Sequence, residues 1–186
     1  MIFKHSGIFT LITGFLLLFL MSCSTPKKAT TSNTVKPSNP AVSANSIKTV
    51  EQKLGFSISS KDPNKALYTE AAQWIGTPYK YGGMSKKGTD CSGITHQIYK
   101  TVYKKTLHRT SAEIAKYDVK NIAKSSLCPG DLVFFATSKN KNAITHVGVF
   151  LKDNYFIHAS SKAGVVVNNL NEDYYKKTYK KSGRVK

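Results

Sequence analysis

The sequence predicts an α+β domain in which N-terminal helices pack against one face of an antiparallel β-sheet. In the first half, apolar residues recur at helical spacing in two segments, whereas the second half holds four short segments rich in Val, Phe and Ile. Pro129-Gly130 marks the change from one pattern to the other. Helices followed by antiparallel strands are typical of the α+β class.

The elements are expected in the following order. A first helix follows the start signal Asp62-Pro63-Asn64, and a glycine-rich loop separates it from a second helix that begins at Asp90-Cys91-Ser92-Gly93. A short helix is expected around residues 110–117. Strands are then expected at Asp131–Phe135, His146–Leu151, Tyr155–Ala159 and Gly164–Asn168. Residues 171–181 are too charged to assign, although Ser182–Val185 could add a small edge strand.

The N-terminus has the composition of an export signal. Lys4 precedes an uncharged apolar run from Ile8 to Met21, which is shorter than the roughly 20 residues that a spanning helix needs. Leu20-Met21-Ser22-Cys23 resembles a bacterial lipobox, in which the cysteine is diacylated and becomes the first mature residue. An ordinary secretory signal, with Cys23 incidental, is the alternative. We expect a lipoprotein signal peptide over residues 1–22 and lipidation of Cys23.

The next segment is expected to be a flexible, lipid-anchored linker over residues 23–61. Between Ser24 and Gly55 it has no aromatic residue and is rich in Ser, Thr, Asn, Lys and Pro, so it has little apolar surface to bury. The catalytic domain is then expected over residues 62–186. This organisation predicts an exported lipoprotein of the bacterial cell envelope, on the outer membrane if the source is Gram-negative.

The net charge of the chain is +18, which points to an anionic partner. For an exported protein, anionic wall polymers or lipid headgroups are expected in place of nucleic acid. The basic residues are spread along the sequence, however, and a simply solvated surface explains them as well.

The cysteines suggest chemistry at one position. Besides Cys23, only Cys91 and Cys128 remain, too few for a disulfide framework, and both are expected to be free thiols. Cys91 falls in the first turn of a helix, where unpaired N–H groups favour the nucleophilic thiolate. A buried structural cysteine explains the same position equally well. Cys128 is expected to pack as a small apolar residue.

Two histidines supply the missing base. His146 opens one strand and His158 lies near the end of the next, and a connecting loop with an odd number of residues places even-numbered positions on one face. The two side chains are then close cross-strand neighbours, which suits a base and a residue that orients it. A zinc site is the weaker alternative, because no fourth ligand is evident. We therefore expect no metal or cofactor, and we interpret His96 as structural or exposed.

Six motifs occur in a fixed order and resemble the NlpC-type (invasion-associated-protein) cysteine peptidases of bacterial cell walls over Ala66–Val185. They are Tyr79-Lys80-Tyr81-Gly82-Gly83, Asp90-Cys91-Ser92-Gly93, Arg109-Thr110-Ser111, Pro129-Gly130-Asp131-Leu132-Val133-Phe134-Phe135, His146-Val147-Gly148-Val149 and Ile157-His158-Ala159. Family members often have Gln where His96 stands and Pro where His108 precedes Arg109.

The resemblance implies a papain-like core and a set of site residues. Cys91 corresponds to the nucleophile, His146 to the general base, and His158 to the third member that orients the imidazole. The backbone N–H of Cys91 or Ser92, with the Tyr79 hydroxyl, would stabilise the oxyanion. Three further residues are implied in oxyanion or substrate binding: Asp90, Arg109 and Ser111.

The leading hypothesis is hydrolysis of peptidoglycan stem peptides at the γ-D-glutamyl–diaminopimelate (or lysine) bond, by a monomer held to the membrane through its lipid. Cleavage of the D-alanyl–diaminopimelate crosslink is the runner-up. Acyl transfer to or from lipids is a different enzyme class that the same cysteine–histidine core could serve. A non-catalytic, basic wall-binding lipoprotein is the remaining alternative.

Overall fold

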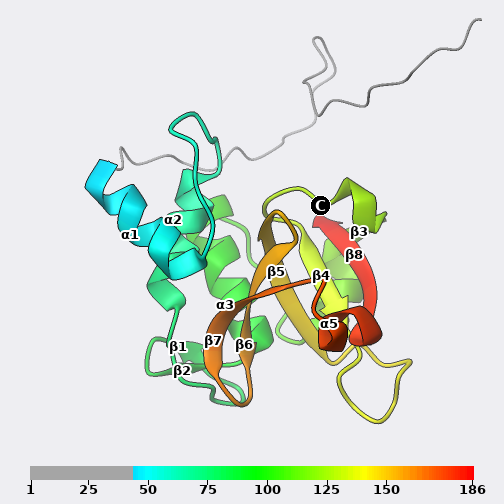
Figure 1. Ribbon diagram of the computed structural model, residues 1–186. Helices are drawn as coiled ribbons and strands as arrows, with labels where there is room; N and C mark the ends of the chain where they lie inside the picture. The colour runs from blue at the N-terminus through cyan, green and yellow to red at the C-terminus, as the bar shows by residue number, and fades with distance from the viewer. Residues whose placement is uncertain (1–43) are drawn as a thin grey trace, which may run out of the picture. The chain divides into compact units, whose positions relative to one another are not determined.

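The computed structural model describes residues 44–186, in which four helices precede a six-stranded antiparallel sheet and a fifth lies before its last strand (Figure 1). The helices are α1 (Ala44–Leu54), α2 (Lys65–Trp74), α3 (Cys91–Ile98), α4 (Ser111–Glu113) and α5 (Asp173–Thr178). π-Helical turns at Tyr99–Tyr103 and Ile114–Asp118 extend α3 and α4. The predicted signal peptide and Cys23 lie outside the described residues. None of the helices described is long and apolar enough to cross a membrane.

The large sheet has the strand order β3-β8-β4-β5-β6-β7, and every neighbouring pair is antiparallel. Its strands are β3 (Val119–Ile122), β4 (Leu132–Phe135), β5 (His146–Lys152), β6 (Tyr155–Ser160), β7 (Gly164–Asn169) and β8 (Tyr179–Val185). A small hairpin of β1 (Met84–Ser85) and β2 (Gly88–Thr89) precedes α3. The α+β prediction is confirmed, as are the first two predicted helices and the four predicted strands.

The last strand was expected to be short and to lie at an edge, and this prediction is wrong. β8 lies between β3 and β4 and is bonded to both. Gly183 explains the tight fit, because a Cβ there would lie 2.4 Å from a methyl group of Val119. The lysines of β8 made this segment too charged to be predicted as a strand from its composition. Lys180 and Lys181 are followed directly by the buried residues Ser182 and Gly183.

The linker prediction is wrong for residues 44–61, which fold with the domain. Val50 and Leu54 of α1 are buried, and α1 packs against α2 (Figure 1). Beyond the helix, Phe56 and Ile58 are buried as well, and the Phe56 ring meets the Tyr68 ring edge-on at 5.4 Å. The few apolar residues are spaced for one helix face, and average composition concealed that spacing.

The sheet is covered on both faces. α1, α2 and α3 share one core with alternate residues of the strands, including Val149 and Ile157. The opposite face carries a second, smaller cluster in which Phe135, Phe156 and Tyr175 pack together. Tyr175 belongs to α5, in the stretch that the sequence left unassigned. The helices were expected on one face only, and α5 is the exception.

Candidate active site

Cys91 lies where the sequence placed it, at the first position of α3. Asp90 is the N-cap residue, and its carboxylate accepts a 2.7 Å hydrogen bond from the backbone N–H of Gly93. A second bond, 2.8 Å long, comes from the N–H of Gly82 and ties the glycine-rich loop to the helix start. Cys91 is 9% exposed, and its thiol is free. Local capping therefore fixes the position of the predicted nucleophile.

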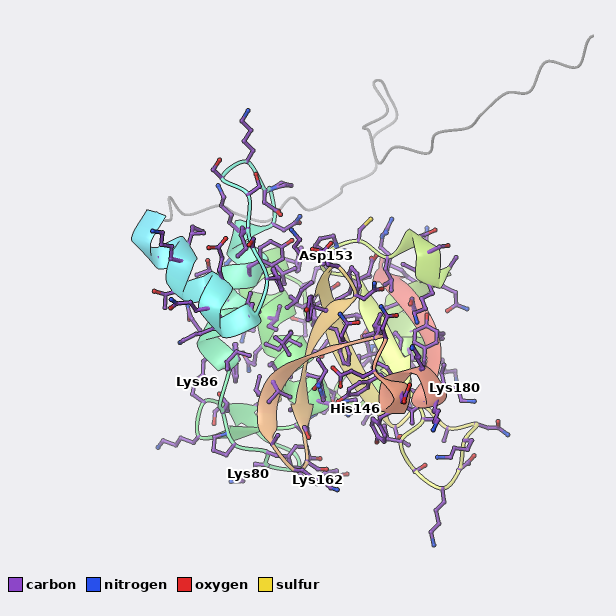
Figure 2. The ribbon with its side chains drawn as sticks, viewed as in Figure 1. Lys80, Lys86, His146, Asp153, Lys162 and Lys180 are labelled. Carbon is purple, nitrogen blue, oxygen red and sulfur yellow. The ribbon has the colours of Figure 1, made fainter. Side chains whose placement is uncertain are left out.

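One pocket of about 160 Å³ brings together four of the predicted site residues: Tyr79, Cys91, His146 and His158. His146 stands at the first position of β5 (Figure 2). The remaining walls come from the loop before β5, the end of β6 with its turn, and α5. They are formed by Thr137, Thr145, Ala159, Ser160, Ser161, Tyr174 and Tyr175.

The two histidines are bonded to each other, as the spacing predicted. The register of β5 and β6 pairs Val149 with Ile157, so His158 lies one pair away from His146 on the same face. The Nε2 atom of His146 is 2.8 Å from Nδ1 of His158. The other ring nitrogen of His146, Nδ1, is left for a reacting partner.

His158 has further partners that the sequence analysis missed. Its Nε2 atom lies 2.9 Å from Oδ1 of Asn168 on β7 and 3.0 Å from the Tyr175 hydroxyl on α5. Asn168 in turn donates from Nδ2 to both carboxylate oxygens of Glu172, at 3.1 and 2.9 Å. His158 pairs with Val166, so Asn168 is one pair farther along β7. Asn168 could have been found from the sequence by extending the predicted strand register from β6 to β7.

The expected depression of the Cys91 pKa is wrong for the resting site. Burial raises the pKa of the Cys91 thiol and outweighs the backbone N–H groups of Val147, Ser92 and Cys91, which lower it. The negative charge of Asp90 adds to the increase. The helix start is present, but its favourable field does not compensate for the loss of solvent.

The histidine partner is neutral in the same state. Burial, followed by the neighbouring His158, lowers the pKa of His146 to about 3. Burial also lowers the pKa of His158, although Asn168 and Glu172 oppose the change. The resting pair is therefore a thiol and a neutral imidazole, and the imidazole is in the protonation state that a general base requires.

Three predicted oxyanion or substrate-binding residues form a scaffold beside the pocket. Arg109 donates to both carboxylate oxygens of Asp90, at 3.0 and 2.7 Å, and to the Ser92 hydroxyl at 2.8 Å. None of the three lines the pocket. Burial opposes ionisation of Asp90, but the bonds from Arg109, Gly93 and Gly82 outweigh it and hold its pKa below the usual value. The structure thus gives these side chains a positioning role at the helix start.

Ser111 also lies away from the pocket. It is buried at the first position of α4, next to a capping box formed by Thr110 and Glu113. This placement explains the residue without a substrate contact.

The two other histidines of residues 44–186 are bonded to groups outside the pocket, and Cys128 departs from its prediction. His96 Nδ1 bonds the carbonyl of Leu107 at 3.0 Å, and His108 Nδ1 bonds Asp118 at 2.7 Å. Cys128 is free, as expected, but it is exposed and not packed as a small apolar residue. The turn at Pro129-Gly130 directs it outward, while its backbone N–H donates to Asp131.

Within residues 44–186, no group of three or more His, Cys, Asp or Glu side chains is arranged to hold a metal ion. The Cys91 and His146 pair meets the requirements of nucleophilic catalysis, with a thiol, a neutral base and a residue that orients the base. The family comparison agrees. The NlpC/P60 family model matches residues 76–184, a span that contains all four pocket residues named in the sequence analysis.

The chain belongs to the NlpC/P60 family of cysteine peptidases. A protein of Escherichia coli K12 named Murein DD-endopeptidase MepS/Murein LD-carboxypeptidase is 31% identical over 158 residues, which cover 82% of each chain. A Haemophilus influenzae protein named Probable endopeptidase is 37% identical over 113 residues, or 61% of this chain and 69% of the relative.

Solved structures of NlpC/P60 proteins share the papain-like fold of this chain. One from Bacillus cereus has a TM-score of 0.59 and 32% identity. The match covers 69% of the chain described here and 42% of the Bacillus cereus chain. The NlpC/P60 domain of the peptidoglycan hydrolase SagA has a TM-score of 0.56 and 26% identity, with 66% and 98% covered.

Proposed function

We propose that this chain is an endopeptidase that hydrolyses amide bonds of peptidoglycan stem peptides, with Cys91 as nucleophile, His146 as general base and His158 as the residue that orients it. The observation that carries the proposal is the shared pocket of Cys91, Tyr79 and the bonded histidine pair. The printed names of the relatives, which include murein and peptidoglycan endopeptidases, support the substrate class.

The resting protonation states define the first step. Nδ1 of neutral His146 accepts the Cys91 thiol proton as the sulfur attacks the carbonyl carbon of the scissile amide. A tetrahedral oxyanion forms and collapses, the C–N bond breaks, and the His146 imidazolium returns the proton to the leaving amine. Water then attacks the thioester while His146 takes a proton from it. Release of the carboxylic acid restores the Cys91 thiol.

Tyr79 is suited to stabilise the oxyanion. Burial raises the pKa of Tyr79, and the neighbouring Asp90 carboxylate and any thiolate formed at Cys91 raise it further, so the Tyr79 hydroxyl keeps its proton and can donate a hydrogen bond. The backbone N–H groups of Cys91 and Ser92 face the sulfur closely enough to lower its pKa, and they are the other donors.

Positive charge beside the pocket fits an anionic wall peptide. Lys80 follows the pocket residue Tyr79, and Lys162 follows the pocket residue Ser161. Both lysines are exposed and lie at the same end of the molecule (Figure 2). Their positive charges would attract the carboxylates of a stem peptide.

Two bonds remain candidates, and the relatives favour the second. The sequence analysis placed the γ-D-glutamyl–diaminopimelate (or lysine) bond first. The relative that covers 82% of this chain is named a DD-endopeptidase, and so is MepH of Escherichia coli, at 37% identity over 125 residues. We therefore propose the D-alanyl–diaminopimelate crosslink as the bond that is cut.

Mass spectrometry of defined muropeptides decides between these possibilities. A crosslinked dimer should yield monomers, whereas cleavage at the γ-D-glutamyl bond would shorten an uncrosslinked stem. Cys91→Ala should abolish either product, and Cys128→Ala, which removes the exposed thiol, is the matched control. If the reduced, folded protein converts no muropeptide, the peptidase proposal fails.

We also propose that Cys23 carries a lipid that holds the enzyme at a membrane of the cell envelope, on the evidence of the lipobox-like residues 20–23. Metabolic labelling with a radioactive or clickable palmitate should mark the full-length protein. Cys23→Ser should remove the label and release the protein from the membrane fraction, and Cys128→Ser should do neither.

A further inference from the structure

His158, the third member of the proposed triad, does not end the series of hydrogen bonds in the pocket. Asn168 and Tyr175 contact its far nitrogen, and Glu172 contacts Asn168. These residues come from β7, from α5 and from the turn between them. Neither the six sequence motifs nor the proposed mechanism assigns them a role.

The orientation of the Asn168 amide follows from Glu172. A carboxylate oxygen only accepts hydrogen bonds, so the side of the amide that faces Glu172 must be the Nδ2 donor. The amide oxygen, Oδ1, is thereby turned toward His158. Glu172 is itself held by the backbone N–H of Asn169, which donates to it at 2.7 Å.

The amide orientation then fixes the His158 tautomer. Because Oδ1 of Asn168 only accepts, the hydrogen on His158 lies on Nε2. The Tyr175 hydroxyl is compatible with this assignment, since it donates its proton to the same oxygen at 3.1 Å. A neutral His158 with hydrogen on Nε2 has a bare Nδ1.

The same logic passes to His146. The bare Nδ1 of His158 accepts the 2.8 Å bond, so Nε2 of His146 must be the donor. A neutral His146 that carries its hydrogen on Nε2 has a bare Nδ1. That atom is the one ring nitrogen able to take the Cys91 proton.

We infer that Asn168 and Glu172 are positioning residues that set the tautomers of His158 and His146 and so keep the general base ready to accept a proton. The role rests on the proposed peptidase function, but it makes a claim about hydrogen positions that does not depend on substrate. Asn168 provides the acceptor, and Glu172 prevents the amide from rotating to present its NH₂ group to His158.

Long-range ¹⁵N–¹H correlation spectra of labelled protein test the tautomers directly. In the wild type at neutral pH, both His146 and His158 should be Nε2–H tautomers. Asn168→Ala should convert His158 to a mixture of the Nε2–H and Nδ1–H tautomers. Glu172→Ala should give a mixture with a smaller share of the Nδ1–H tautomer. An Nδ1–H tautomer of either histidine in the wild type would overturn the inference.

Kinetics on a crosslinked muropeptide provide the second measurement. Asn168→Ala should lower kcat by roughly tenfold, the effect of one lost hydrogen bond, with little change in KM. Glu172→Gln should restore most of the rate lost in Glu172→Ala, because its amide oxygen still accepts from Asn168. A purely structural role would instead lower thermal stability without moving the tautomers.

Asn169→Ala is the matched control, because this neighbouring side chain bonds only the carbonyl of Asp153 and the N–H of Asn171. It should leave kcat and both tautomers unchanged. Unchanged tautomers and kcat in both Asn168→Ala and Glu172→Ala would reject the inference. If Asn168→Ala does not fold, the exposed Glu172 still gives the test through Glu172→Ala. Expected tautomers in a protein that hydrolyses no muropeptide would reject the proposed function alone.

Discussion

The two sides of the pocket are built with different chemistry. On the helix side, the start of α3 is held by the ion pair between Asp90 and Arg109, with oxygen and nitrogen 2.7 Å apart. On the strand side, His146, His158 and Asn168 form a series of hydrogen bonds between neutral groups, and its first charged member is the exposed Glu172. The proposed nucleophile, Cys91, is thus held by charges, and the proposed base, His146, by neutral donors and acceptors.

Because of this difference, the helix side sets the position of Cys91 and the strand side sets the protonation state of His146. The Asp90–Arg109 pair fixes the backbone that carries Cys91, but burial raises the pKa of the Cys91 thiol and the Asp90 carboxylate raises it further. The strand side keeps His146 neutral and determines which nitrogen carries the hydrogen. We therefore expect the proposed reaction to begin with proton transfer and not from a preformed thiolate.

His146→Gln tests the strand side most severely. Removal of the base should lower kcat by about 10³-fold, because general-base catalysis contributes between about 10² and 10⁴. Stability at pH 7 should hardly change, since the wild-type ring is neutral there. A muropeptide assay with denaturant unfolding as the control gives both values. A variant that kept a tenth of the wild-type kcat would contradict the assignment.

Arg109→Ala tests the helix side. It leaves the buried Asp90 carboxylate without its cation, and the free energy of unfolding should fall by about 2 kcal/mol, less than for a fully buried pair because Arg109 is partly exposed. Urea unfolding measures the loss, and Arg109→Lys should recover part of it. KM for a muropeptide should stay constant. A large rise in KM without destabilisation would instead show that Arg109 binds the substrate.

Acid should weaken the strand side before the helix side. A buried histidine whose folded pKa lies below its unfolded value of 6.5 contributes stability that is complete above pH 6.5 and is lost as the pH falls toward about 3. Between pH 6.5 and 5 the free energy of unfolding should fall by about 1–2 kcal/mol. The Asp90 contribution is lost only at lower pH, below the carboxylate's usual pKa of 3.8.

The control for that experiment is His146→Gln, which should lose less stability over the same interval. A wild-type protein whose stability is constant from pH 6.5 to 5 would show that its histidines take up protons as readily in the folded state as in the unfolded chain. It would also remove the contrast between the two sides of the pocket.

The smallest expected effect is on thiol reactivity. In a Cys128→Ser background, the rate of iodoacetamide alkylation of Cys91 should still be rising at the pH where an ordinary thiol is half ionised, because burial raises the Cys91 pKa. Cys91→Ser, which reports Cys128 alone, is the comparison. A plateau reached below neutral pH would instead indicate a thiolate stabilised by the helix start.

Local patterns were sufficient to predict that Cys91, His146 and His158 lie together. Cys91 follows a capping aspartate, and the two histidines fall on one face of adjacent strands, so short-range rules of helix capping and strand alternation located all three. Tyr79 came with the family motifs. The structure places these four residues in one pocket, as expected.

The residues behind His158 required tertiary information. Asn168 reaches the histidine only through the register of a third strand, and Tyr175 only through a helix that the charged stretch after residue 170 concealed. Arg109 is the opposite case. It stands in a recognisable motif, but the motif does not show that its guanidinium is already bound to Asp90. Sequence patterns located the residues of the pocket better than the groups that hold them.

The position of β8 has a consequence for how the chain folds. β3 and β4 both pair with this strand, and Val119 meets Val185 across 66 positions of sequence. Contacts this distant in sequence form late and slowly. If export proceeds N-terminus first, as the proposed signal peptide requires, the middle of the sheet would stay open until β8 had crossed the membrane. A truncation before Tyr179 would leave two bare strand edges, and edges of that kind promote aggregation.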